Sequence, residues 1–240
     1  MQNTVVITGA GISVESGIQP FRGKNGIWNE NPTEMATYRN FRTNTSAFLQ
    51  WYYHRFVSCK DALPNKAHEI LAKKGIKLVT QNIDNLHIKA GHTIDSLIEI
   101  HGNINFKRTL SAIDRDELIL AHWNQVDENH LERDLFELFR IRKDGNIDEQ
   151  YSMRPHILLF DEYYTELYQY SKAQQWLEDS STIIFIGTSN SVGFTYGALQ
   201  EALFANKKII VVDPNPAPSF FQPGVEIITS TATAFCEQYF

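Results

Sequence analysis

The chain begins with Met1-Gln2-Asn3-Thr4-Val5-Val6-Ile7-Thr8-Gly9-Ala10-Gly11-Ile12-Ser13, an apolar run that leads directly into a glycine turn. Such a run is typical of a short β-strand, and a Gly-x-Gly turn lets the backbone come within hydrogen-bonding distance of a pyrophosphate. The start of the next helix would add unpaired N–H groups. Val14 stands where the usual dinucleotide-binding fingerprint has its third glycine. Taken alone, the stretch fits a dinucleotide site and a plain strand-to-helix turn equally well.

Apolar runs of strand length recur along the chain, and several are continuous rather than alternating, as expected for parallel strands covered on both faces. They are Val5–Thr8, Ile76–Thr80, Leu97–Ile100, Ile157–Phe160, Ile183–Ile186, Lys208–Val212 and Val225–Ile228. Segments with helical patterns lie between them, at Thr45–Val57, Lys66–Lys74, Thr165–Glu178 and Thr195–Ala205. This alternation predicts an α/β fold, a doubly wound, Rossmann-like parallel sheet whose ligand crevice lies at the carboxyl ends of the strands.

Size and composition favour one large domain over residues 1–240, with a small module inserted at about residues 107–153. The formal net charge is −6, and the sequence has no basic block and no apolar run long enough to span a bilayer. We therefore expect neither a nucleic-acid nor a membrane partner. The first residues already read as a strand rather than a leader, so a cytoplasmic location is the expectation.

Four blocks of sequence carry a resemblance to a known family. They are Gly9 to Arg22, Thr80-Gln81-Asn82-Ile83-Asp84-Asn85-Leu86-His87, His101-Gly102, and Gly187-Thr188-Ser189-Asn190-Ser191. In this order and with these spacings they resemble the sirtuins, a family of NAD-dependent protein deacylases, over nearly the whole chain. The resemblance implies NAD as cofactor and an acyl-lysine protein or peptide as substrate. It also implies release of nicotinamide and O-acyl-ADP-ribose.

The same resemblance implies which residues bind the cofactor. Arg22 would hold a phosphate with its planar guanidinium, and Phe21 would shield the reacting face of the ribose. Asn82 and Asp84 would bind the nicotinamide carboxamide, although Asn-x-Asp at a strand end can also build an Asx turn. The full predicted set is Gly9, Ala10, Gly11, Ser13, Phe21, Arg22, Gln81, Asn82, Asp84, Gly187, Thr188, Ser189, Ser191, Asp213 and Ala232.

His101 is the predicted catalytic base, because an imidazole can accept the proton of a ribose hydroxyl near neutral pH. Asp213 follows the predicted strand Lys208–Val212, at a point where the family usually has asparagine. A carboxylate there would accept hydrogen bonds from both ribose hydroxyls and repel a 2′-phosphate, which favours NAD over NADP.

The segment Arg154-Pro155-His156-Ile157-Leu158-Leu159-Phe160-Asp161-Glu162 resembles the family strand that pairs with the substrate backbone. We therefore predict that Ile157, Leu158 and Phe160 line the acyl-lysine channel. Asp161 replaces the glycine of the family pattern, which predicts an altered loop at this point.

Tyr52 and Arg55 are three residues apart and share one face of the predicted helix Thr45–Val57. Tyr-x-x-Arg at this place resembles the sirtuins that remove succinyl and malonyl groups, and the upstream Ala36-Thr37 matches that class. A phenol and a guanidinium at the end of an apolar tunnel can bind a distal carboxylate. The same spacing also fits an ordinary amphipathic helix.

The inserted module lacks the zinc pattern of the family, which has two Cys-x-x-Cys pairs in this region. No cysteine lies between Phe106 and Arg154, and the two cysteines of the chain, Cys59 and Cys236, are far apart. Because thiolates normally supply a structural zinc site, we expect a metal-free module held by leucine and phenylalanine side chains. Substitute ligands are the less favoured interpretation; they would be His122, Asp127, His130 and Glu132.

Two other functions use the same residues. An NAD glycohydrolase or ADP-ribosyltransferase would use the same crevice with water or another nucleophile. A non-catalytic sensor would bind NAD or ADP-ribose without turnover, and the presence of Asn82, Asp84 and His101 argues against it.

Overall fold

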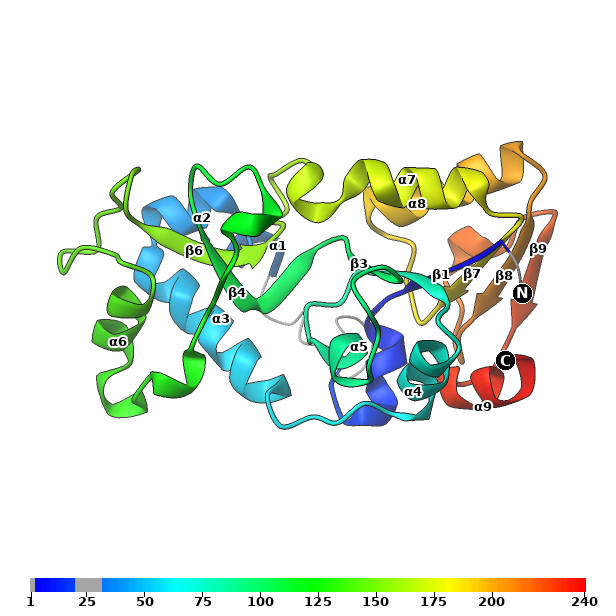
Figure 1. Cartoon of the computed structure of the whole chain (residues 1–240), viewed down its shortest axis with the longest axis horizontal. Helices are drawn as coiled ribbons and strands as arrows, with labels where there is room; N and C mark the ends of the chain where they lie inside the picture. The colour runs from blue at the N-terminus through cyan, green and yellow to red at the C-terminus, as the bar shows by residue number, and fades with distance from the viewer. Residues whose placement is uncertain (1–2, 20–31) are drawn as a thin grey trace.

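The computed structural model describes residues 3–19 and 32–240, and its larger part is built on a six-stranded parallel sheet. The strand order is β3-β2-β1-β7-β8-β9. The order reverses beside β1, which places the ligand crevice of a doubly wound sheet at the carboxyl ends of β1 and β7 (Figure 1). The strands are β1 (Thr4–Thr8), β2 (Lys77–Thr80), β3 (Leu97–Glu99), β7 (Thr182–Ile186), β8 (Lys208–Val212) and β9 (Val225–Ile228).

Helices cover both faces of this sheet, which explains why its strands are continuously apolar. Val5 and Ile7 pack toward α7 (Tyr170–Asp179) and α8 (Gly193–Phe204). Val6 points the other way, toward α4 (Lys66–Lys73) and α9 (Ala232–Tyr239). The two helical layers are seen above and below the sheet in Figure 1. The predicted α/β fold with a Rossmann-like parallel sheet is confirmed.

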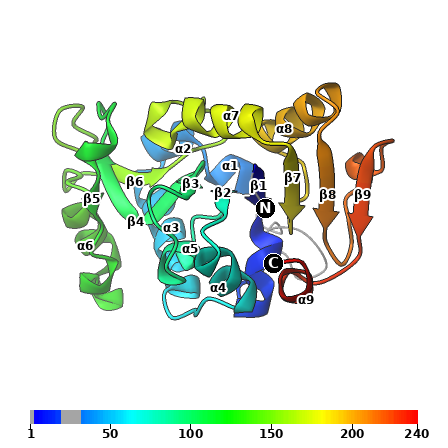
Figure 2. The same ribbon diagram turned by 45° about the vertical axis from the view of Figure 1, so that its right-hand side comes forward.

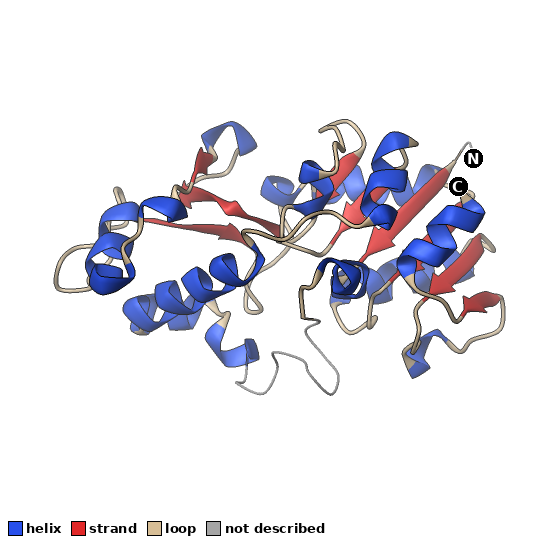
Figure 3. Cartoon of the chain, turned by 90° about the horizontal axis from the view of Figure 1, so that it is seen from below, coloured by secondary structure: helices blue, strands red, loops and turns tan. Residues whose placement is uncertain are grey.

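A second, antiparallel sheet stands apart from the first, in the order β5-β4-β6. Its strands are β4 (Gly102–Thr109), β5 (Ile119–Leu120) and β6 (Met153–Ile157). Figures 2 and 3 show it at the opposite end of the molecule from β9, beside α2 (Tyr38–Thr43), α3 (Thr45–Cys59) and α6 (Leu131–Leu138). The remaining α-helices are short, α1 (Pro32–Met35) and α5 (Leu86–Lys89).

The core of this second part is aromatic. The Trp123 side chain is 1% exposed, stacks on Phe56 at 5.6 Å and donates from Nε1 to the Ile104 carbonyl at 2.7 Å. Phe139 meets the Trp123 ring edge-on at 5.1 Å. Within residues 3–19 and 32–240, no three His, Cys, Asp or Glu side chains are arranged to hold a metal ion. Nor is any helix of these residues long and apolar enough to cross a membrane.

The strand predicted at Ile157–Phe160 is wrong in place and partner. The strand is β6, it ends at Ile157, and it pairs with β4 rather than with the parallel sheet. Arg154, near the start of β6, is buried although arginine is usually a surface residue, and Glu162 neutralises its charge. Pro155 fits because β6 is an edge strand, where a missing N–H costs no ladder hydrogen bond.

The helix predicted at Thr165–Glu178 is divided into two pieces. A 3₁₀ turn covers Glu166–Tyr168, and α7 begins only at Tyr170. Gln169 between them has φ 54° and ψ 40°, a left-handed conformation that no helix contains. The hydrophobic pattern continues across this break, so periodicity alone does not reveal it.

Trp123→Ala should lower the free energy of unfolding by about 3–5 kcal/mol, because it leaves a cavity in the second core. Denaturant and thermal unfolding measure the loss. Ile113→Ala is the control, since that side chain is 82% exposed.

A chelator should leave the Tm of the unchanged protein unaltered, because the inserted module is expected to hold no zinc. Thermal unfolding with and without chelator, together with elemental analysis, measures this. One tightly bound zinc per chain, with a Tm that falls in chelator, would contradict the metal-free module.

Candidate active site

The predicted cofactor loops meet at the carboxyl ends of β1, β2 and β7. The Gly11 N–H donates to the Gly187 carbonyl at 2.8 Å, and the Asn82 side-chain amide donates to the Gly9 carbonyl at 3.1 Å. A Cβ added to Gly187 would lie 2.4 Å from the Ile12 nitrogen, and one added to Gly11 would lie 2.5 Å from the Gly187 Cα. Glycine is therefore required on both loops for this close approach.

Three predicted nicotinamide and phosphate residues form one hydrogen-bonded group beneath the loops. Ser13, in a 3₁₀ helix over Ala10–Ser16, is fully buried and donates to the Asp84 carboxylate at 2.7 Å. The Asn82 amide donates to Ser13 Oγ at 3.1 Å. Burial raises the pKa of Asp84, while the Leu86 N–H and Ser13 hold it down. Phe21 and Arg22 lie outside the described residues.

The remaining predicted cofactor residues follow β2, β7 and β8 or stand at the start of α9. Gln81, which belongs to the Thr80–His87 block, donates to Thr188 Oγ1 at 3.0 Å, and this bond joins the block to the loop that begins at Gly187. Ser189 and Ser191 share a hydrogen bond of 2.7 Å. Burial raises the pKa of Asp213, whose carboxylate accepts the Asn215 N–H at 2.7 Å. The Ala232 side chain packs in the core against the sheet.

His101 stands between β3 and β4 with both ring nitrogens in contact. Nδ1 lies 3.0 Å from the Gln81 carbonyl, and because a carbonyl only accepts, Nδ1 carries the proton. Nε2 therefore has the lone pair, and it lies 3.1 Å from the Tyr164 hydroxyl. Burial lowers the pKa of His101 to about 4, against the Gln81 hydrogen bond that raises it. The imidazole is neutral at physiological pH, which is the form a base requires.

Gly102 explains the His-Gly pair in the sequence. It has φ +82°, and a Cβ there would lie 2.1 Å from the His156 carbonyl oxygen on β6. Only glycine allows β4 to start immediately after His101. Tyr164 was missed by sequence reasoning, because a tyrosine two residues after Glu162 belongs to no recognised motif.

The predicted substrate segment leaves β6 and runs past His101. Ile157 is buried, Leu158 is half-buried and Phe160 is 50% exposed. The backbone N–H groups of Leu158, Leu159 and Phe160 all donate within the chain. Their acceptors, at 3.0, 2.9 and 3.0 Å, are the His101 carbonyl, the Glu162 carboxylate and the Ala36 carbonyl. A peptide added here would therefore have to pair with carbonyl oxygens of the segment.

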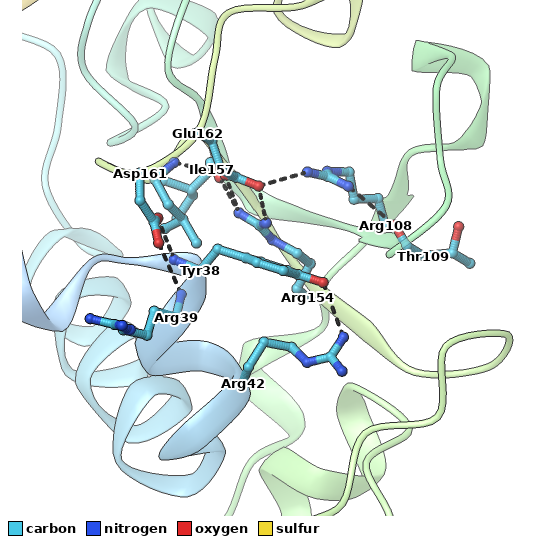
Figure 4. Close-up of polar contacts among 10 residues, drawn as sticks. Tyr38, Arg39, Arg42, Arg108, Thr109, Arg154, Ile157, Asp161 and Glu162 are labelled. Carbon is cyan, nitrogen blue, oxygen red and sulfur yellow. Dashed lines mark hydrogen bonds and ion pairs between the residues drawn. The ribbon is translucent and has the colours of Figure 1, made fainter.

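Asp161 docks the loop after β6 on a helix. Its two carboxylate oxygens accept the N–H groups of Tyr38 and Arg39 at 2.6 and 3.0 Å, at the start of α2 (Figure 4). A negative charge is favourable there because the helix N-terminus carries partial positive charge. Glu162, the next residue, accepts both terminal nitrogens of Arg154, one of them at 2.8 Å. The Asp161 contacts join the substrate segment to α2, and the Glu162 contact joins it to β6.

Tyr52 and Arg55 lie on α3, and Tyr52 packs with Ala36 and Ile157 in the second core. Burial raises the pKa of Tyr52, while the positive charges of Arg55 and Arg154 lower it. Burial lowers the pKa of Arg55, whose guanidinium lies 4.9 Å from the centre of the Trp51 ring. Tyr52 therefore lies in the same core as Ile157, a residue predicted to line the acyl-lysine channel.

The sequence of this chain is similar to those of known proteins. A sequence model of the Sir2 family matches residues 9–193. NAD-dependent deacetylase sir2E of Dictyostelium discoideum is 32% identical over 85% of this chain, and the match spans 63% of its own length. The NAD-dependent protein deacylase of Aggregatibacter actinomycetemcomitans is 31% identical over 90% of this chain and 95% of its own.

Solved structures agree with these relatives. A mutant Sir2 homologue in complex with ADP-ribose has a TM-score of 0.78 and 26% identity, covering 98% of this chain and 89% of its own. A Sir2–p53 peptide–NAD⁺ complex has a TM-score of 0.76 and 26% identity, covering 98% of this chain and 91% of its own.

Gly187→Ala should weaken NAD binding at least tenfold, because the added methyl group forces the two loops apart at a backbone contact and at a positive φ. Isothermal titration with NAD measures the affinity. Gly197→Ala is the matched control, since a Cβ there meets nothing within 4 Å. Equal NAD affinity in the two folded variants would show that the glycine contact does not shape the cofactor site.

Proposed function

The chain belongs to the Sir2 family of NAD-dependent protein deacylases, and we propose that it preferentially removes acyl groups that end in a carboxylate, such as succinyl and malonyl. The observation that carries this preference is the Tyr52–Arg55 pair of α3, in which Tyr52 shares a buried core with Ile157 of the predicted channel wall. A neutral acyl group such as acetyl would give this pair no charge to bind.

The residues present fit NAD as cofactor. The contact of Gly11 with Gly187 forms a cradle that any Cβ would fill, and Asn82 and Asp84 place an amide and a carboxylate below it. NAD, when bound, supplies a ribose carbon that loses nicotinamide and accepts the acyl oxygen. Asn82 and Asp84 would orient the carboxamide, and His101 would take the ribose hydroxyl proton at Nε2.

The charges around the acyl end favour an anion. Although burial raises the pKa of the Tyr52 phenol, two guanidinium groups, those of Arg55 and Arg154, lower it by their positive charge, and Arg154 is also bound by Glu162 in a two-point contact. Stacking on Trp51 uses the face of the Arg55 guanidinium, whereas a carboxylate would be bound by the N–H donors in its plane. Tyr52 would add a neutral hydroxyl donor, because burial keeps its phenol protonated.

NAD glycohydrolase activity is the second candidate, and one observation favours it. The N–H groups of Leu158, Leu159 and Phe160 are all committed within the chain, which limits strand addition by a peptide. A weakly held peptide would leave water as the competing nucleophile at the same ribose carbon. The sensor alternative is less favoured, because His101 is in the tautomer that a base needs.

Mass spectrometry of reactions with NAD tests the proposal. Succinyl-, malonyl- and acetyl-lysine peptides, and a sample without peptide, should be compared at equal concentration. We expect O-acyl-ADP-ribose to form fastest with the two acidic acyl groups. Release of ADP-ribose at the same rate with and without peptide would favour the glycohydrolase instead.

Arg55→Met should lower kcat/KM for a succinyl peptide at least tenfold, since a hydrogen bond to a charged group contributes about 1.5–3 kcal/mol. Acetyl-lysine turnover should be unchanged or improved, because the desolvated guanidinium is gone. Arg133→Met is the control, as that side chain is 65% exposed on α6. A parallel loss on both substrates would return Tyr52 and Arg55 to a packing role.

His101→Ala should reduce deacylation by at least a hundredfold while NAD still binds, because general-base catalysis typically contributes about 10²–10⁴-fold. Turnover is measured at saturating NAD, and affinity by titration. His122→Ala, an exposed histidine, is the control. Turnover near that of the unchanged enzyme would remove His101 from the mechanism.

A further inference from the structure

The base of this site has a neighbour that the reaction described so far does not use. The Tyr164 hydroxyl lies 3.1 Å from His101 Nε2, and the two rings stack at 6.0 Å with an angle of 26°. Because the Gln81 carbonyl fixes the proton on Nδ1, Nε2 can only accept, so Tyr164 donates. The lone pair that must take the ribose proton is therefore already occupied.

Tyr164 is itself fixed by two aromatic neighbours. Its ring stacks on Tyr170 at 5.3 Å and 18°, and tilts against Phe194 at 6.0 Å. Burial raises its pKa to about 12, against the hydrogen bond from the Phe194 backbone N–H. Phe194 is in the first turn of α8, which follows the second cofactor loop directly. The phenol thus links the base to the helix that follows this loop.

We propose that Tyr164 is a positioning residue for the deacylase reaction: it holds the neutral imidazole of His101 in place and occupies Nε2 until the ribose hydroxyl displaces it. The proposal rests on the proposed function, because it takes His101 as the base. No proton leaves Tyr164, since the ribose proton passes to Nε2 and the phenol only changes partner. A hydroxyl with two lone pairs can then accept a hydrogen bond from the imidazolium.

The contact also affects the acid–base properties of the site. A hydrogen bond donated to the neutral form of a histidine disfavours its charged form and lowers its pKa. The same direction follows from burial, which the Gln81 carbonyl opposes. Within residues 3–19 and 32–240, Tyr164 is the ionisable side chain in contact with the ring, and the Tyr170 ring stacks on Tyr164.

Tyr164→Phe separates the hydroxyl from the ring, because it keeps both stacking contacts. We expect the pKa of His101, titrated by NMR in the ligand-free protein, to rise by about half to one pH unit. The acid limb of kcat/KM should move up by the same amount, while kcat well above that limb stays within about threefold of the unchanged enzyme. Cleavage of NAD without peptide should increase several-fold, because Nε2 is no longer occupied.

Tyr170→Phe is the matched control. It removes a hydroxyl from the same stack, one that accepts from Gln174 at 3.2 Å and does not touch His101. An unmoved His101 titration in Tyr164→Phe, or an equal shift in Tyr170→Phe, would overturn the proposal. The NMR titration needs no acyl substrate. It therefore tests Tyr164 even if the acyl preference or the deacylase reaction itself proves wrong.

Discussion

The close contact of two glycine loops is the constraint on which the rest of the site depends. Gly11 and Gly187 touch backbone to backbone at the ends of β1 and β7, where the strand order of the sheet reverses. With the loops this close, Asn82 can reach the Gly9 carbonyl, and Gln81 can reach Thr188. Because Gln81 also fixes the tautomer of His101, the glycine contact indirectly determines which ring nitrogen of His101 carries the lone pair.

A second constraint joins the predicted substrate segment after β6 to His101. The Gly102 conformation lets β4 begin immediately after His101, and the Leu158 N–H then donates back to the His101 carbonyl. Asp161 fastens this segment to the first turn of α2. A change in the position of α2 would therefore also shift the position of His101, because one short stretch of backbone connects the two.

Much of this arrangement could be predicted from the sequence, because glycine spacing and continuous apolar runs report directly on backbone approach and two-sided burial. The parallel sheet and the meeting of the Gly9, Asn82 and Gly187 blocks are of this kind. The true place of β6 was not, since a buried Arg154 depends on a partner that comes later in the chain. The left-handed Gln169 likewise has no local signal in its residue type.

The contacts of Asp161 and Tyr164 could not be predicted from the sequence, and the physical reason is the same for both. Asp161 and Tyr164 act through a single polar group whose partner is distant in sequence, on α2 in one case and at His101 in the other. A family pattern describes Asp161 only as a missing glycine and Tyr164 not at all. In three dimensions both belong to the same loop after β6, on either side of Glu162. The loop predicted to contact the acyl-lysine thus also holds α2 and His101, so a single structural element would serve both roles proposed for this site.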